Sequence, residues 1–140
     1  MRYWDASMLV CLCVEESDTR AARRLAAGGI ATWSVSAVEI ASALERRSRE
    51  AALDAHGRAM ARAALAELMA SWTEITSLTA VRERALRLVA THALRAADAM
   101  QLAAALVAVS DRPAGHEFVC ADARLREAAA REGFEVLPAR

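Results

Sequence analysis

Four acidic side chains of this chain have types and positions suited to binding a metal ion: Asp5, Glu39, Asp98 and Asp122. Asp98 is the most informative, because it lies inside the alanine-rich apolar run 94–106. At helical spacing, Leu94, Asp98, Leu102 and Leu106 fall on roughly one face, so the Asp98 carboxylate is predicted to point the way the apolar side chains point. An unpaired carboxylate in such surroundings is unfavourable. We therefore interpret Asp98 as a metal ligand in a cleft, provided that other acids lie near it.

Each acid also has an ordinary structural role that the sequence leaves open. Asp5 and Asp122 each precede a predicted helix and are suited to capping its N-terminus. Asp98 falls in the first turns of its helix, where an acid interacts favourably with the helix dipole. Ser36-Ala-Val-Glu39 matches the capping box S-x-x-E, in which the Glu side chain accepts a hydrogen bond from the backbone N–H of the Ser. Taken alone, Glu39 fits a cap better than a metal ligand.

Short β-prone segments alternate with helical segments along the chain. The predicted strands are residues 2–4, 30–33, 73–76, 117–120 and 134–137. The predicted helices are the apolar run 8–14, residues 21–27, a long stretch after Ser36 that ends at Glu50, residues 53–72, residues 79–90, a helix from Leu94 that ends near Asp111, and residues 123–131, which Gly133 terminates. This alternation predicts a three-layer α/β/α fold with a mostly parallel sheet of about five strands and helices on both faces. We expect one domain over residues 1–140.

The joint placement of the acids favours a site over four separate caps. Asp5 and Asp122 both come just after a predicted strand, and Glu39 lies one turn into the helix that follows another. The carboxyl ends of parallel strands gather at one edge of a sheet, so the acids are expected to share that edge with Asp98. Carboxylates held close together repel one another unless a cation neutralises them. All-oxygen ligation suits Mg²⁺ or Mn²⁺.

The composition excludes several other chemistries. The 18 basic and 18 acidic residues give a net charge of zero, so no overall field points to a nucleic acid or a membrane. Every basic residue is Arg, and the absence of Lys excludes a Walker-type phosphate loop and Schiff-base catalysis. The spacing of the His and Cys residues predicts neither a zinc site nor a disulfide framework: His56, His92, His116, Cys11, Cys13 and Cys120. We expect a soluble cytoplasmic protein with no membrane segment.

Four motifs surround the acids in order along the chain. W-D-A-S contains Asp5 and Ser7, S-V-S-A-V-E-I-A-S-A-L contains Ser36 and Glu39, L-R-A-A-D-A-M-Q-L-A contains Asp98, and F-V-C-A-D-A-R-L, followed by G-F-E-V-L, contains Asp122. Through these motifs, which cover nearly the whole chain, the sequence resembles the PIN-domain ribonucleases, and most closely the VapC-type toxins of bacterial toxin–antitoxin pairs. The sequence departs from that family at Cys120, where a Thr or Ser is common, so that a weak thiol donor replaces a hydroxyl.

The resemblance implies a Mg²⁺- or Mn²⁺-dependent endoribonuclease that cuts structured RNA, such as transfer or ribosomal RNA, and leaves 5′-phosphate and 3′-hydroxyl ends. The acids would hold one or two ions, and the residues that orient them would be Ser7, Ser36 and Cys120. Arg95 and Arg124 are candidates for contact with the RNA phosphates, although a solvated surface Arg is the commoner role. The family also implies a homodimer and a cognate antitoxin protein that covers the cleft.

Two other interpretations remain open at this stage. The first is an acid-pocket phosphatase or phospho-acceptor domain, in which one Asp is phosphorylated. Such proteins need a Lys, which this chain lacks, and the phosphatases place a second Asp two residues after the first, where this chain has Ser7. The second is a non-catalytic α/β interaction domain whose acids are only helix caps. Caps predict no effect of divalent ions on thermal stability, whereas an acid cluster predicts stabilisation by Mn²⁺.

Overall fold

A five-stranded sheet forms the centre of the protein in the computed structural model, which describes residues 1–140. The strands are β1 (Arg2–Trp4), β2 (Ala31–Trp33), β3 (Thr73–Ile75), β4 (Glu117–Val119) and β5 (Glu135–Leu137). Their order is β3-β2-β1-β4-β5, and every neighbouring pair is parallel. The predicted α/β fold with a mostly parallel sheet is therefore confirmed, and the sheet is parallel throughout.

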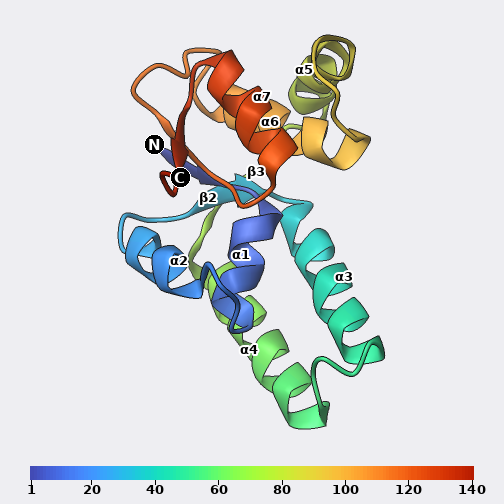
Figure 1. The fold of residues 1–140 in the computed structure, drawn as a ribbon. Helices are drawn as coiled ribbons and strands as arrows, with labels where there is room; N and C mark the ends of the chain where they lie inside the picture. The colour runs from blue at the N-terminus through green and yellow to red at the C-terminus, as the bar shows by residue number, and fades with distance from the viewer.

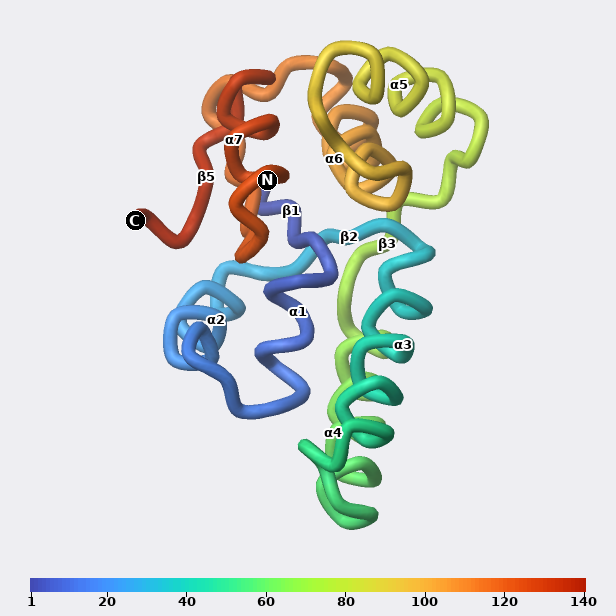
Figure 2. The backbone as a smooth tube through the Cα atoms, turned by 45° about the vertical axis from the view of Figure 1, so that its right-hand side comes forward, coloured from blue at the N-terminus to red at the C-terminus, as the bar shows by residue number.

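Seven helices cover the two faces of this sheet: α1 (Ala6–Cys13), α2 (Thr19–Ala26), α3 (Ser36–Arg49), α4 (Ala55–Ser71), α5 (Leu78–Thr91), α6 (Ala96–Ala108) and α7 (Ala123–Glu132). Helices α5, α6 and α7 lie on one side of the sheet, and α1, α2, α3 and α4 lie on the other (Figure 1). The three predicted layers are present. Figure 2 shows α3 and α4 as an antiparallel pair that extends away from the sheet.

Alternating strand residues supply the two halves of the core. Tyr3 and Phe118 pack with α5, α6 and α7, and their rings stack with centroids 5.4 Å apart. Trp4 and Val119, one residue further along each strand, pack with α1, α3 and α4 on the opposite face. Because successive side chains of a strand point to opposite faces, three-residue strands suffice to anchor both helical layers.

The chain path creates a topological switch point beside β1. From β1 the chain moves to β2 and β3 on one side and then returns to β4 and β5 on the other side. In open parallel sheets, ligands bind at such a switch point, outside the carboxyl ends of the strands. Asp5 directly follows β1, and its backbone N–H donates to the Val119 carbonyl at the end of β4, with an N–O distance of 3.1 Å. The ends of β1 and β4 therefore stay side by side where the site is expected.

The element boundaries differ from the predicted ones by one to three residues, the largest difference being the end of α6 at Ala108. Ile30, Thr76, Cys120 and Phe134 flank their strands, and α6 begins at Ala96 because Arg95 has extended backbone angles. Such differences are usual at frayed ends. Helix α7 ends at Gly133, which adopts a φ of 110° as the predicted C-terminal glycine should. No helix combines the length and the apolar character that a membrane span requires.

Candidate functional site

A cleft of about 850 Å³ opens at the carboxyl edge of the sheet. Helix α3 forms one wall, and the N-termini of α6 and α7 form the other. Three of the four predicted acids line this cleft: Glu39, Asp98 and Asp122. The fourth, Asp5, is only 4 % exposed and lies within electrostatic range of Glu39 and Asp98. The structure thus brings the four acids to one edge, as the sequence predicted.

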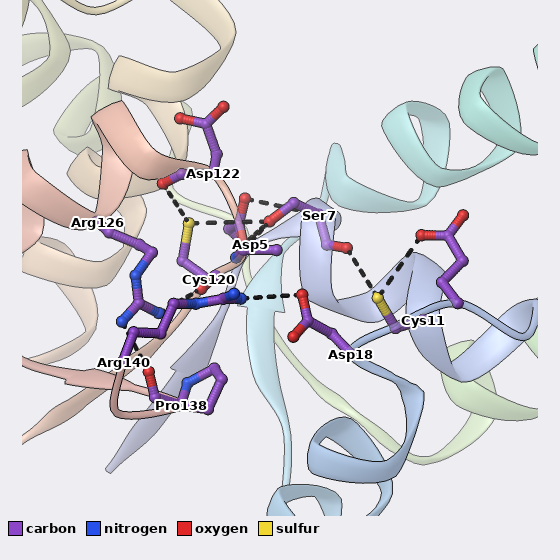
Figure 3. A network of polar contacts seen from close by, with 11 residues as sticks. Asp5, Ser7, Cys11, Asp18, Cys120, Asp122, Arg126, Pro138 and Arg140 are labelled. Atoms are coloured by element: carbon purple, nitrogen blue, oxygen red, sulfur yellow. Dashed lines mark hydrogen bonds and ion pairs between the residues drawn. The ribbon is translucent and has the colours of Figure 1, made fainter.

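Asp5 is held by the turn that follows β1. It caps α1: the Ser7 hydroxyl donates to Asp5 Oδ1 at 2.7 Å, and the Ser7 backbone N–H donates to Oδ2 at 3.3 Å (Figure 3). The Ser7 oxygen also accepts a hydrogen bond from the Ala121 backbone N–H at 2.9 Å, which ties the end of β1 to the loop before α7. Burial raises the pKa of Asp5 to about 6, against the lowering effect of the Ser7 hydrogen bonds.

Glu39 does not form the predicted capping box. Val35 occupies the N-cap position of α3, and no side chain caps this helix. The Glu39 Oε1 atom instead accepts a hydrogen bond from the Gln101 amide at 3.2 Å, while the Ser36 hydroxyl bonds to Thr32 at 2.8 Å. The capping-box interpretation was wrong because Ser36 faces the sheet, where it is fully buried. Burial, together with the charges of Asp5 and Asp98, raises the pKa of Glu39 to about 7.

Asp98 is the least satisfied of the four acids. It lies in the first turn of α6, is half-buried, and takes part in none of the side-chain hydrogen bonds or ion pairs of the structure. Burial is the largest cause that raises the pKa of Asp98. The charge of Asp122 raises this pKa further, and the charge of Arg95 lowers it. The helix dipole alone would favour the charged carboxylate and lower its pKa, so a role at the helix N-terminus does not explain the raised pKa of Asp98.

Asp122 has the structural role that was left open for it, and one of its oxygens remains available. The side chain caps α7 by accepting a hydrogen bond from the Leu125 backbone N–H at Oδ1, with a distance of 2.9 Å. The residue is exposed to solvent and lines the cleft. Its second carboxylate oxygen has no hydrogen bond to the protein. A cap and a ligand are thus compatible roles for this residue, whereas both carboxylate oxygens of Asp5 already accept hydrogen bonds from Ser7.

The acids share one edge without converging on one point. No three His, Cys, Asp or Glu side chains of the chain are placed to bind a single metal ion together. An ion at this edge would have one or two carboxylate ligands and would complete its shell with water or with substrate oxygens. Mg²⁺ is commonly bound by proteins in this way, because it gives up its water molecules reluctantly.

Cys120 lies at the position where a hydroxyl was expected. Its side chain is fully buried, donates to the Asp122 carbonyl at 3.6 Å, and lies 3.8 Å from the Ser7 oxygen (Figure 3). Burial, strengthened by the charge of Asp5, raises the pKa of this thiol far above its usual range. Cys120 is therefore a neutral thiol that supports the loop before Asp122 and contacts Ser7.

Three arginines face the same cleft. Arg95 and Arg124, the two candidates for phosphate contact, line the cleft on the wall that carries Asp98 and Asp122, and Arg46 on α3 lines the opposite wall. All three are exposed, and none belongs to the nine ion pairs of the protein. Sequence reasoning missed Arg46, although its signal was present. Glu39, Ser42 and Arg46 have the i, i+3, i+7 spacing that places side chains on one helical face.

A group of buried polar residues behind Glu39 was also missed: Tyr3, Thr32 and Gln101. The sequence signal that could have identified them was Gln101, which interrupts the same apolar run as Asp98. It follows Asp98 by three residues, so that both lie on one side of α6.

Comparison of the sequence with models of known protein families and with curated proteins gave no match. The chemistry of the site is therefore argued from its geometry. Unpaired carboxylates facing unpaired guanidinium groups are suited to bind a hydrated divalent cation together with a phosphate.

Proposed function

We propose that this chain is a Mg²⁺- or Mn²⁺-dependent endoribonuclease of the PIN-domain type and the toxin component of a type II toxin–antitoxin system. The observation that carries the proposal is Asp98, a half-buried carboxylate with no protein partner, in a cleft shared with Glu39 and Asp122. Because an unpaired buried charge is unfavourable, a residue kept only for capping or packing would be expected to find a partner. A bound cation would supply that partner.

The donor set fits Mg²⁺ or Mn²⁺. The cleft offers carboxylate oxygens and contains no histidine, a composition that suits hard cations better than zinc. A divalent ion held by one or two of the carboxylates Glu39, Asp98 and Asp122, with Asp5 behind them, would also offset the mutual repulsion that adds to burial in raising the pKa of Glu39 and Asp98. When bound, it would supply Lewis-acid activation of water and neutralise charge at the phosphate for in-line hydrolysis.

The arginines would position the RNA. Arg46 on one wall and Arg95 and Arg124 on the other would contact phosphates on either side of the acids. Arg46 follows Glu39 by seven residues, a rise of about 10 Å along α3, so it would contact a phosphate beyond the one being cut. This local placement of three unpaired cations accounts for how a chain with zero net charge would bind RNA.

The proposed partners follow from the family resemblance. They are structured RNA as substrate, a second copy of the chain, and a cognate antitoxin protein in the cytoplasm. An apolar groove between α3 and α4, lined by Ala41, Leu44, Leu65 and Met69, supports the idea that the stretch from Leu44 to Trp72 offers a surface to a protein partner. Met69 is 47 % exposed there, which is high for a methionine that serves only the core.

The test is an RNA cleavage assay on the purified full chain. Transfer and ribosomal RNA are incubated with Mg²⁺, with Mn²⁺ and with EDTA, and the product ends are labelled. We expect discrete cuts with 5′-phosphate ends that disappear in EDTA and in the Asp98→Asn variant. Glu83→Gln, which removes an exposed acid outside the cleft, is the matched control and should cut like the wild type. Cutting that survives EDTA or Asp98→Asn would contradict the mechanism.

The competing interpretation is a non-catalytic interaction domain. Its support is that Asp5 and Asp122 cap helices through hydrogen bonds from Ser7 and Leu125. Thermal unfolding with and without Mn²⁺ separates the two, because a ligand that binds only the folded state raises the melting temperature. Absence of both RNA cleavage and any effect of Mn²⁺ would favour the interaction domain. Stabilisation by Mn²⁺ without cleavage of these RNAs would retain the metal site and call for another phosphodiester substrate.

A further inference from the structure

The buried polar residues of this protein are concentrated behind one carboxylate. Apart from aromatic residues and cysteines, five residues with polar side chains are buried: Asp5, Thr19, Thr32, Ser36 and Gln101. Three of them, Thr32, Ser36 and Gln101, form one hydrogen-bonded chain that ends at Glu39. Since a buried polar group is unfavourable unless it is fully bonded, an apolar core would be the simpler solution for stability alone.

Within this hydrogen-bonded chain of side chains, the number of available protons fixes which group donates in each hydrogen bond. The Thr32 hydroxyl has one proton and donates it to the Trp4 carbonyl at 2.7 Å. The contact between Thr32 and Ser36, at 2.8 Å, must therefore use the Ser36 proton. The Ser36 oxygen is then left as an acceptor, and it accepts from the Gln101 amide nitrogen at 2.9 Å.

The same count fixes the orientation of the Gln101 amide. Its oxygen accepts a hydrogen bond from the Tyr3 hydroxyl at 2.7 Å, and its nitrogen faces Ser36. The second proton of that nitrogen is directed at Glu39 Oε1, 3.2 Å away. With the amide turned over, its oxygen would face the ionised Glu39 carboxylate and no proton would lie between them. Gln101 therefore presents a donor to Glu39 that cannot turn away without breaking the other bonds.

We propose that Gln101 is a positioning residue for Glu39. Its amide holds Oε1 of the carboxylate and leaves Oε2 without a protein hydrogen bond, on a residue that lines the cleft where a divalent cation would bind if the proposed function is correct. The network joins β1, β2, α3 and α6, so Glu39 is fixed relative to Asp98, which lies one turn before Gln101 on α6. Residues that orient metal ligands in this way commonly change metal affinity by about 10- to 100-fold when they are replaced.

The test compares metal binding in three variants of the full chain. Gln101→Leu keeps the size of the side chain and removes its donors. Glu39→Gln removes the charged group that the donors hold. Thr19→Val is the matched control, because Thr19 is buried and hydrogen-bonded to the Cys11 carbonyl at 2.9 Å outside this network. Mn²⁺ affinity is measured by electron paramagnetic resonance of the free ion, and circular dichroism confirms that each variant is folded.

We expect Gln101→Leu to weaken Mn²⁺ binding by about 10-fold or more and Thr19→Val to leave it unchanged. In the Glu39→Gln background, Gln101→Leu should have no further effect, because its influence acts through Glu39. Equal losses in both backgrounds would show a general structural effect and overturn the proposal. Wild-type affinity in folded Gln101→Leu would overturn it as well.

A measurement without metal separates this proposal from the proposed function. The side-chain amide protons of Gln101 are followed by nitrogen-15 NMR in EDTA. One of them should move when Glu39→Ala removes its acceptor, and the other should stay in place on Ser36. If that shift is seen but the wild type does not bind Mn²⁺, the metal-dependent function fails and the contact stands. If the shift is absent, the positioning of Glu39 by Gln101 is refuted whatever the metal does.

Discussion

The Ser7 hydroxyl donates a hydrogen bond to the Asp5 carboxylate at 2.7 Å from the first turn of the helix that Asp5 itself caps. The same hydroxyl oxygen accepts the Ala121 backbone N–H, so one small side chain connects β1 to the loop that carries Asp122. The position of one acid relative to another thus depends on Ser7, which is itself only partly buried.

We expect Ser7→Ala to lower the free energy of unfolding by about 1 to 3 kcal/mol, because it leaves the Ala121 N–H without its partner and removes a donor from a buried carboxylate. Urea denaturation measures the difference. Ser71→Ala is the control: Ser71 is an exposed hydroxyl that bonds only to carbonyls of its own helix, and its loss should change the free energy by less than about 0.5 kcal/mol. Equal effects of the two variants would contradict the linking role of Ser7.

The raised pKa values predict that the metal-free protein loses stability as the pH rises from about 4 to about 8. Asp5 rises from 3.8 to about 6 and Glu39 from 4.5 to about 7, so the folded protein holds protons that the unfolded chain has released. Stability due to these protons is complete below the unfolded pKa values and disappears above the folded ones. Carboxyls with lowered pKa values, such as Asp111 and Glu117, have the opposite effect on stability, which is complete once the pH lies above their unfolded pKa values.

Asp5→Asn isolates the contribution of one acid to this pH dependence. Because Asn is neutral and its amide can still bond to Ser7, we expect the variant to be more stable than the wild type by about 2 to 3 kcal/mol at pH 8 in EDTA, and equally stable near pH 4. Urea denaturation at the two pH values gives the difference. A constant difference at both values would mean that burial does not raise the Asp5 pKa.

Divalent ions should reverse this loss. At pH 8, Mn²⁺ at about 100 times its dissociation constant should stabilise the wild type by about 2.7 kcal/mol, because it binds the folded state only. Differential scanning fluorimetry should show a rise in Tm of several degrees. The rise should be absent in Asp98→Asn and retained in Glu83→Gln. If Asp98→Asn were stabilised to the same extent, Mn²⁺ would be binding elsewhere.

Local patterns in the sequence were sufficient to predict the fold. The strands and helices follow from apolar periodicity and from stop signals such as Gly133, which act over a few residues. The common location of Asp5, Glu39 and Asp122 at one edge of the sheet could be predicted as well, since each acid closely follows a predicted strand in the sequence. Asp98 was identified as a charge within an apolar run.

The network behind Glu39 could not be predicted in the same way. The Tyr3–Gln101 and Gln101–Ser36 hydrogen bonds span 98 and 65 residues, so they depend on the order of the strands and on which face α6 covers. The capping box failed for the same reason. The local motif offered Ser36 a partner within its own helix, but Thr32 and Gln101 bond to it from other elements. Local propensity was overridden by a tertiary contact.

Arg46 provides the last test, because it separates substrate binding from the chemistry at the acids. Arg46→Gln removes one phosphate contact from the α3 wall and leaves the four acids untouched. For the proposed nuclease, we expect KM for RNA to rise several-fold with little change in kcat. The slope of log binding constant against log salt concentration should become shallower by the amount expected for one phosphate contact. Arg49→Gln, which changes an exposed arginine on the same helix outside the cleft, should leave both constants unchanged. A loss of kcat in Arg46→Gln at unchanged KM would instead place Arg46 among the groups that act on the reacting phosphate. Equal effects of the two arginine variants would indicate a diffuse electrostatic field in place of a contact at the α3 wall.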